Sequence, residues 1–280
     1  MTNSPSAPDD ETHRRSSTVE TKTEQRYLYC LVDTSATSET EVPAKGVDDV
    51  SVRLVSHREV GAVVQDCGHP LETERLDQLK QWAMSHQRVV DKAGETFGTP
   101  LPVRFNTVLE GGDGAVSDWL ASRYSQIHGE LATLAGTWEY RLHLLWNSTP
   151  FEEAVTEDDD ELRRLIERKQ QADSGTAFLL EKKYEKRLRS LLQERRDELR
   201  SKLWRTAESI AVEVAEQPAT ATLEQQPSPE SDKPIGCLAV RVPADAESTL
   251  GQRLDEFVDE TGAAVRFTGP WPPYTFVSDL

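Results

Sequence analysis

The feature that most constrains the fold is the end of the chain, where three prolines are interspersed with aromatic residues between Phe267 and Val277. Proline fixes φ and removes a backbone donor, so this segment can form neither a helix nor a central strand. Residues that precede a proline are pushed to extended geometry, and Gly269 allows a turn before Pro270. We therefore expect a stiff, extended arm that buries a large aromatic area where it docks.

Composition limits the classes of protein to be considered. The chain has 280 residues, enough for one large domain or two ordinary ones. Its formal net charge is −17, and its 32 basic residues are 22 Arg and 10 Lys. This excess of carboxylates suits a protein that stays hydrated in strong salt, and a merely solubilising acidic surface is the alternative. The negative field repels nucleic acid, which disfavours a general nucleic-acid role.

Cysteines and apolar runs bear on the cellular compartment. Cys30, Cys67 and Cys237 are odd in number and far apart, so the sequence predicts no disulfide framework and fits a reducing cytoplasm. The N-terminus has no apolar signal region, and no stretch approaches transmembrane length. We expect a cytoplasmic protein that does not enter a membrane.

The first half of the chain predicts an α+β domain over residues 25–136, after a disordered leader over 1–24. The expected elements are strands at 26–32, 50–55 and 60–64, a helix at 73–96, a strand at 103–109 and a helix at 116–134. The second and third strands form a hairpin with its turn at 56–59. The helix at 73–96 should place Leu76, Leu79, Trp82 and His86 on its core face, and His86 should be a hydrogen-bonded core histidine.

The second half predicts another α+β domain, over residues 137–280. Its expected elements are a strand at 138–144, a helix capped by Thr149 with Pro150 in its first turn, a long helix at 177–214, a flexible linker at 216–233, a strand at 235–242, a helix at 246–261, a strand at 263–268 and the tail at 269–280. This order indicates a split β-α-β unit with helices inserted over 150–215. The predicted fold class is α+β with two domains.

Four segments resemble the gas vesicle proteins of the GvpF/GvpL family. They are Tyr27-Leu28-Tyr29 with Leu31-Val32, Gly61-Ala62-Val63-Val64, Leu101-Pro102-Val103-Arg104-Phe105-Asn106-Thr107-Val108, and Thr268-Gly269-Pro270-Trp271-Pro272-Pro273-Tyr274-Thr275-Phe276-Val277. The last is similar to the family's terminal signature, with Thr275 in place of a Ser. Asn106 stands where the family has Gly, and Asn is the other residue that best tolerates a positive φ.

The resemblance implies two α+β domains, the first peculiar to the family and the second a modified ferredoxin-like domain with inserted helices. It implies that the tail packs against both domains, and we expect Trp271, Pro272, Pro273, Tyr274 and Phe276 to do so, with Trp271 and Tyr274 as its anchors. It also implies a non-catalytic role in the assembly of gas vesicles, with the shell protein GvpA and other accessory gas vesicle proteins as partners. Length and the polar insertions favour the GvpL member of the family. The acidic composition indicates a halophilic source.

Two basic features are candidate contact sites. Arg104 lies between Val103 and Phe105 in an expected strand, and a buried structural arginine is favoured there over a binding residue. Residues 182–205 carry ten basic and four acidic side chains. That basic helical face could dock an acidic partner, or it could pair within the protein. Its candidate docking residues are Lys182, Lys183, Lys186, Arg187, Arg195 and Arg196.

Signals for chemistry are weak, and we expect no catalytic residue, cofactor or metal. Cys67 and His69 supply two metal ligands where structural zinc needs four, and the acidic run 157–161 lacks a calcium-loop pattern. No nucleophile elbow or phosphate loop is present. The competing hypotheses are a ferredoxin-like module that binds nucleic acid, which needs exposed strand aromatics and basic flanks, and an enzyme with an unrecognised site.

Overall fold

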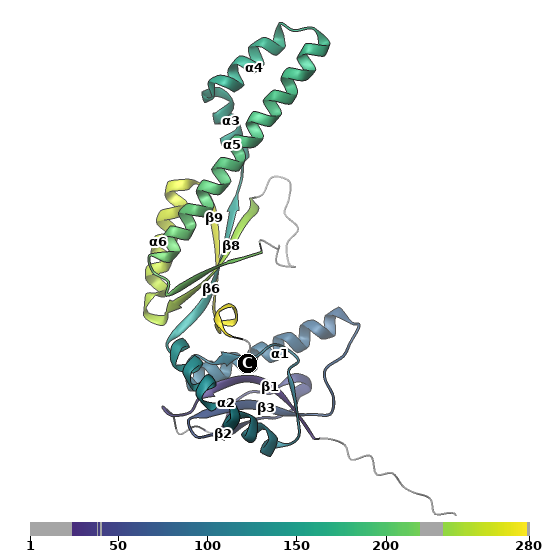
Figure 1. The fold of residues 1–280 in the computed structure, drawn as a ribbon, viewed down its shortest axis with the longest axis vertical. Coiled ribbons are helices and arrows are strands. Elements are labelled where there is room, and N and C mark those ends of the chain that lie inside the picture. The colour runs from purple at the N-terminus through teal and green to yellow at the C-terminus, as the bar shows by residue number, and fades with distance from the viewer. Residues whose placement is uncertain (1–23, 38, 40, 219–231, 279–280) are drawn as a thin grey trace, which may run out of the picture.

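The computed structural model describes residues 24–37, 39, 41–218 and 232–278. The predicted leader lies outside these residues except for Glu24, and so does most of the predicted linker. The molecule is elongated: a first sheet with two helices lies at one end, a second sheet in the middle, and a helical arm at the other end (Figure 1). The expected α+β class is confirmed.

The first sheet is antiparallel and is centred on β1. Its strands are β1 Gln25–Asp33, β2 Val52–His57, β3 Val60–Cys67, β4 Leu101–Pro102 and β5 Val108–Glu110. β1 pairs with β3 on one side and with β4 and β5 on the other, and β2 pairs with β3. The predicted hairpin of β2 and β3 is therefore confirmed.

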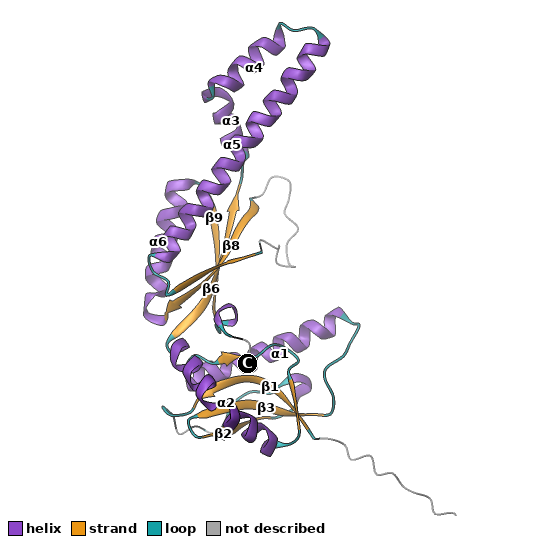
Figure 2. Cartoon of the chain, viewed as in Figure 1, coloured by secondary structure: helices purple, strands orange, loops and turns teal. Residues whose placement is uncertain are grey.

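Two helices cover opposite faces of this sheet (Figure 2). Helix α1 spans Leu76–Phe97, and it packs with the 3-10 turn Val47–Asp49 against Tyr27 and Tyr29 of β1. Helix α2 spans Asp113–Leu134 and packs against Leu28. Because both faces are covered, the interior of β1 is buried throughout, as its unbroken apolar run predicts.

The second sheet has the strand order β7-β8-β6-β9 and is also antiparallel. Its strands are β6 Thr137–Trp146, β7 Glu213–Gln217, β8 Lys233–Pro243 and β9 Ala264–Trp271. The 3-10 turn Ala244–Ala246 and helix α6, Glu247–Thr261, connect β8 to β9. With the helices between β6 and β7, this is the β-α-β-β-α-β order of a ferredoxin-like unit.

Three helices follow β6 and form the projecting arm. They are α3 Thr149–Asp158, α4 Asp160–Gln170 and α5 Ser174–Glu208. The lower part of α5 packs with α6 on one face of the second sheet, through Leu199 and Leu203. The upper part packs against α3 and α4, away from both sheets (Figure 2).

The structure corrects the predicted end of the long helix. The sequence predicted a helix to residue 214, but α5 ends at Glu208 and Val214 lies in β7. Glu216 and Gln217, which were assigned to the linker, also belong to this edge strand. The error arose because β7 is short and polar and its apolar residues continue the helical spacing.

Three smaller predictions also change. The strand predicted at 103–109 is interrupted, because Asn106 adopts a φ of 67° and turns the chain between β4 and β5. This confirms the expectation that Asn106 tolerates a positive φ. The N-cap of α3 is Ser148, one residue before the predicted Thr149. Leu76 and Leu79 are exposed, because the core face of α1 begins only at Trp82.

Candidate functional surfaces

The tail lies where the two sheets meet (Figure 1). Strand β9 is an edge strand, which is where a sheet tolerates the proline at position 270. Beyond it, Pro272 and Pro273 are buried, and Tyr274–Phe276 form a 3-10 turn. The arm is therefore extended only as far as the prolines and then turns.

Glu139 of β6 holds the tail on the second sheet. Its carboxylate is fully buried and accepts hydrogen bonds from the Thr275 backbone N–H at 2.7 Å and from Thr275 Oγ1 at 2.9 Å. Arg141 lies beside it, with its Nη2 atom 3.1 Å from Glu139 Oε1. A buried carboxylate needs such partners, so the tail and Arg141 together satisfy Glu139.

Tyr274 and Val277 connect the same tail to the first sheet. The Tyr274 hydroxyl donates to Gln87 Oε1 of α1 at 3.2 Å, and burial raises the pKa of this hydroxyl. Val277 packs on the cluster that contains Leu28 and α2. The tail thus contacts elements of both halves of the chain.

Two hydrogen bonds outside the tail also join the halves of the chain. The Thr99 hydroxyl donates to the Thr137 carbonyl at 3.0 Å, and Arg241 Nη1 of β8 donates to the Thr133 carbonyl of α2 at 3.2 Å. Gly94 of α1 lies so close to the Trp138 ring that a Cβ there would be 2.8 Å from it. The second sheet is therefore in direct contact with the helices of the first half, in addition to the connection through the tail.

Two of the predicted structural residues lie elsewhere than expected. Trp271, which was expected to be an anchor of the tail, is 38% exposed, so its ring is not fully buried. Pro272 and Pro273 are the buried part of the tail, and Tyr274 and Phe276 are half-buried. Arg104 is exposed rather than buried, because the turn at residue 106 takes its segment out of the sheet; it lines a hollow of about 220 Å³ together with Val277.

A buried polar network in the first core was only partly predicted. His86 is buried, and its Nδ1 atom lies 2.9 Å from the Tyr27 hydroxyl, which confirms the expected hydrogen-bonded core histidine. Burial lowers the pKa of His86 to about 4, so the ring is neutral at pH 7. Tyr29 donates to Gln65 and accepts from the Val47 N–H at 2.8 Å, two contacts that have no local sequence signal. The network fixes the first core and presents no nucleophile.

A second charged cluster ties α2 to the first sheet. Asp113 at the start of α2 accepts from Arg26 Nε at 2.7 Å and from Arg53 Nε at 3.0 Å. The Arg53 and Arg26 guanidinium groups hold the pKa of the Asp113 carboxyl at about 2. All three groups have partners within the chain, so this cluster is structural.

The structure separates the six candidate docking residues of α5 into two groups. Arg187 pairs with Asp159 at 2.7 Å, and Arg195 pairs with Glu198 and donates to the Thr261 carbonyl. Arg196 is half-buried, and its Nε atom is buried without a hydrogen-bond partner in the described part of the chain. Arg187 and Arg195 therefore have partners within the chain, and all three arginines are half-buried. Lys182, Lys183 and Lys186 are exposed on the arm.

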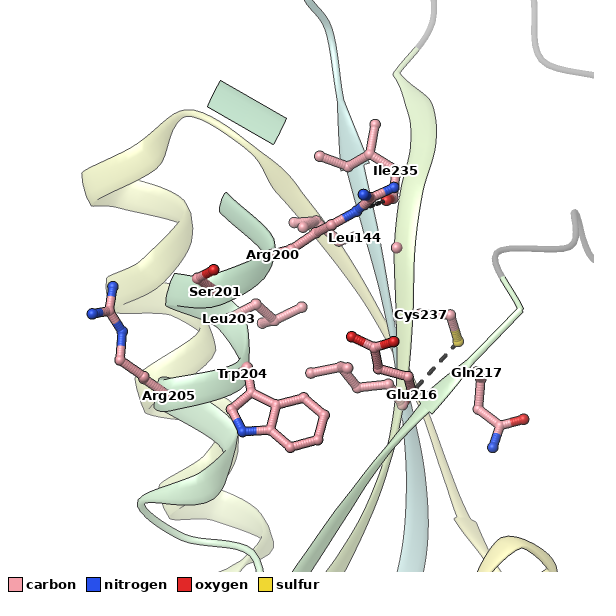
Figure 3. Close-up of a pocket in the computed structure, with 12 residues that line it drawn as sticks. Leu144, Arg200, Ser201, Leu203, Trp204, Arg205, Glu216, Gln217, Ile235 and Cys237 are labelled. Atoms are coloured by element: carbon pink, nitrogen blue, oxygen red, sulfur yellow. Dashed lines mark hydrogen bonds between the residues drawn. The ribbon is translucent and has the colours of Figure 1, made fainter. Parts of the chain in front are cut away.

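A hollow with a volume of about 530 Å³ lies between α5 and the ends of β7 and β8 (Figure 3). Leu203 and Trp204 of α5 form its apolar wall, and Ile235 of β8 lies opposite them. Arg200 closes one end, where its Nε atom donates to the Ile235 carbonyl at 2.5 Å. Ser201, Glu216 and Cys237 also line the hollow, and the Cys237 thiol contacts the Leu238 carbonyl. No hydrogen bond among the described residues joins one of these three side chains to another, as an activated nucleophile and its base would require.

Within the described residues, no group of three or more His, Cys, Asp or Glu side chains is placed to hold a metal ion. Cys30 and Cys237 are buried in different sheets, and the Cys67 Sγ atom contacts the His69 carbonyl at 2.7 Å. None of the described helices is both long and apolar enough to cross a membrane.

Comparison with known proteins gives one family. The profile of the family described as gas vesicle synthesis protein GvpL/GvpF matches residues 25–278. Gas vesicle protein L1 of Halobacterium salinarum is 47% identical over 255 residues, which are 91% of each chain. Gas vesicle protein L of Haloferax mediterranei is 42% identical and is matched over 93% of this chain and 89% of its own.

Solved structures show the same fold. The crystal structure of the gas vesicle protein GvpF from Anabaena sp. PCC7120 superposes with a TM-score of 0.68 at 19% identity, over 92% of this chain and 99% of that one. GvpF from Microcystis aeruginosa gives a TM-score of 0.60 at 17% identity, over 90% and 98%. At these identities the likeness concerns the fold alone.

Proposed function

This chain belongs to the GvpL/GvpF family of gas vesicle synthesis proteins, and we propose that it is a non-catalytic accessory protein of gas vesicle formation. The observation that carries the proposal is the family match over residues 25–278, together with L-type relatives that are more than 40% identical over nine tenths of the chain. We place the protein in the cytoplasm, associated with gas vesicles. The acidic composition fits the halophilic source of these relatives.

Under this proposal the protein acts by binding other gas vesicle proteins, namely the shell protein GvpA and accessory proteins. Residues 25–136 and 137–280 would be two domains, since each sheet has hydrophobic clusters of its own. The tail would fix their relative orientation through Thr275 and Tyr274. A fixed frame with a projecting arm suits a protein that positions partners rather than one that converts a substrate.

The arrangement of the second sheet disfavours nucleic-acid binding. Tyr140 and Phe267 stack with ring centroids 5.0 Å apart, and they belong to the face that α5 and α6 cover. A ferredoxin-like module that binds nucleic acid would present such aromatics to the ligand. The net charge of −17 acts against it as well.

The test is deletion of the gene from its own cell, followed by return of a tagged wild-type copy. The deletion strain should lack gas vesicles or form few, and the tagged copy should restore them and co-purify with at least one other gas vesicle protein. A strain that expresses the tag alone is the control. Normal vesicles in the deletion strain, with no gas vesicle protein recovered on the tag, would contradict the proposal.

A further inference from the structure

The upper half of α5 carries an exposed face that combines apolar and basic side chains. Phe178 and Leu179 are 60% and 62% exposed, although residues of this type are normally buried. Four exposed cations follow them on the same helix. We name this surface the arm face and define it by Phe178, Leu179, Lys182, Lys183, Lys186 and Arg189.

Helical geometry places these residues together. Phe178, Lys182 and Lys186 are spaced four residues apart, and Arg189 follows three residues later, so they form one row along α5. Leu179 and Lys183 form a parallel row beside it. The set covers about 17 Å of helix at 1.5 Å per residue.

The opposite side of α5 is already occupied. Leu180 is buried there, the Tyr184 hydroxyl lies 3.1 Å from Thr156 Oγ1 of α3, and Arg187 pairs with Asp159 at the start of α4. The helices of the arm therefore cover that side and leave the arm face to solvent.

The cations of the arm face are largely without partners. Lys182 pairs with Glu185 at 2.7 Å and lies 5.8 Å from the centre of the Phe178 ring. Lys183 and Lys186 make no ion pair or hydrogen bond with any described residue, and Arg189 interacts only electrostatically with Glu185. A chain with 17 more acidic than basic residues has abundant carboxylates to pair with. An exposed cluster of four cations that shares one carboxylate, Glu185, keeps a positive charge and is thus complementary to a second acidic surface.

We propose that the arm face binds an acidic surface of another gas vesicle protein, with Phe178 and Leu179 as the apolar anchors. The proposal rests on the proposed function and adds the surface and the chemistry of the partner. In about 1 M salt the screening length is about 3 Å, so the lysines would act only at contact distance. Apolar burial does not weaken in this way, so the two exposed apolar residues would supply affinity where charge alone would not.

The test uses the full chain and each co-encoded gas vesicle protein as a separate purified probe, at the salt concentration of the cell. Two variants remove the two parts of the arm face: Phe178→Ser with Leu179→Ser, and Lys183→Glu with Lys186→Glu. Each should weaken binding of one acidic probe about tenfold or more. Lys183→Arg with Lys186→Arg should keep the affinity, because the charge is retained.

A matched control lies on α1, where Leu76 and Met84 are exposed and Lys80 lies between them. Leu76→Ser with Met84→Ser, and separately Lys80→Glu, should leave binding unchanged. Thermal melts would verify that all variants fold. If the wild type binds a probe and both arm variants bind it equally well, or only the α1 variants lose it, the arm face is not the site and the proposed function stands. If the wild type binds no gas vesicle protein, both proposals fail.

Discussion

The two sheets of this protein differ in how they are covered. β1 of the first sheet is buried along its whole interior, because α1 and α2 lie on opposite faces of it. β6 of the second sheet alternates, with Tyr140, Leu142 and Leu144 under α5 and α6. No described helix lies against its other face (Figure 2). The first sheet is thus a closed structural body, and the second keeps surface available.

The uncovered face of the second sheet is polar and basic. The strand register places Cys237, His143 and Arg266 side by side across β8, β6 and β9, with Arg141 two residues from His143. Burial and the neighbouring Arg266 and Arg141 lower the pKa of His143. The tail covers the end of this face at Glu139. The first sheet is therefore buried on both faces, whereas the second has a core on one face and is covered by the tail only at the end of the other.

The largest loss of stability is expected from a substitution in the core of the first sheet. Leu28→Ala removes a fully buried side chain and should lower the free energy of unfolding by about 2–5 kcal/mol. Leu145→Ala in β6, where the side chain is half-buried and outside the main cluster, should cost about 1 kcal/mol. Denaturant unfolding at fixed salt measures both. Equal costs would contradict the difference between the sheets.

The pH dependence should also separate the sheets. The pKa of His86 falls from 6.5 in the unfolded chain to about 4 in the fold, so below pH 6.5 the unfolded chain binds more protons. The contribution of His86 to the free energy of unfolding is therefore fully present above pH 6.5. As the pH falls towards 4, this contribution is lost, which lowers the free energy of unfolding by about 3 kcal/mol.

Unfolding measured from pH 7 to 4 tests this prediction. His86→Gln should reduce the slope of the free energy of unfolding against pH in that window, whatever its effect on stability at pH 7. His143→Gln on the uncovered face should change the slope less, because that ring is only half-buried. A wild-type curve that is already flat would refute the assignment of a neutral His86.

The tail prediction addresses the junction between the sheets. Glu139→Gln removes the charge from the acceptor of both Thr275 hydrogen bonds and from the partner of Arg141, and should cost about 2 kcal/mol. Hydrogen exchange at the Thr275 amide should become faster. Glu213→Gln, which changes an exposed carboxylate paired with Arg241, should leave that exchange rate unchanged. Slow exchange in both variants would show that the tail does not depend on Glu139.

The smallest expected effect concerns Trp271. Because this ring is 38% exposed, Trp271→Ala should lower stability by about 1 kcal/mol, rather than by the several kcal/mol expected of a buried ring. Thermal melts compare it with Glu139→Gln. A loss larger than that of Glu139→Gln would restore the ring as the principal anchor of the tail.

Much of the fold was predictable because it is encoded locally. The apolar run of β1, the hairpin of β2 and β3, and the alternation of β6 all have their period in the sequence. β7 was missed because five residues that include Glu213 and Gln217 become a strand only through pairing with β8.

The site residues depend on distant contacts and were harder to predict. Glu139 alternates with the core residues of β6, and it is buried because a segment 136 positions later covers it. The burial of Arg104 was predicted from the alternation of a strand through residues 103–109. The turn at Asn106 interrupts that strand, so the prediction fails. The arm lysines were predicted as a candidate surface, but their separation from Arg187 and Arg195 required the packing of α3, α4 and α6.

The most direct test is hydrogen exchange of the full chain, alone and bound to a gas vesicle protein that it recognises. The account predicts that binding slows exchange along the arm at residues 176–190 and leaves the amides of β1 and β3 unchanged. Protection confined to α1 or to the first sheet, with no change along the arm, would contradict the division between a closed structural sheet and a partner-binding second half.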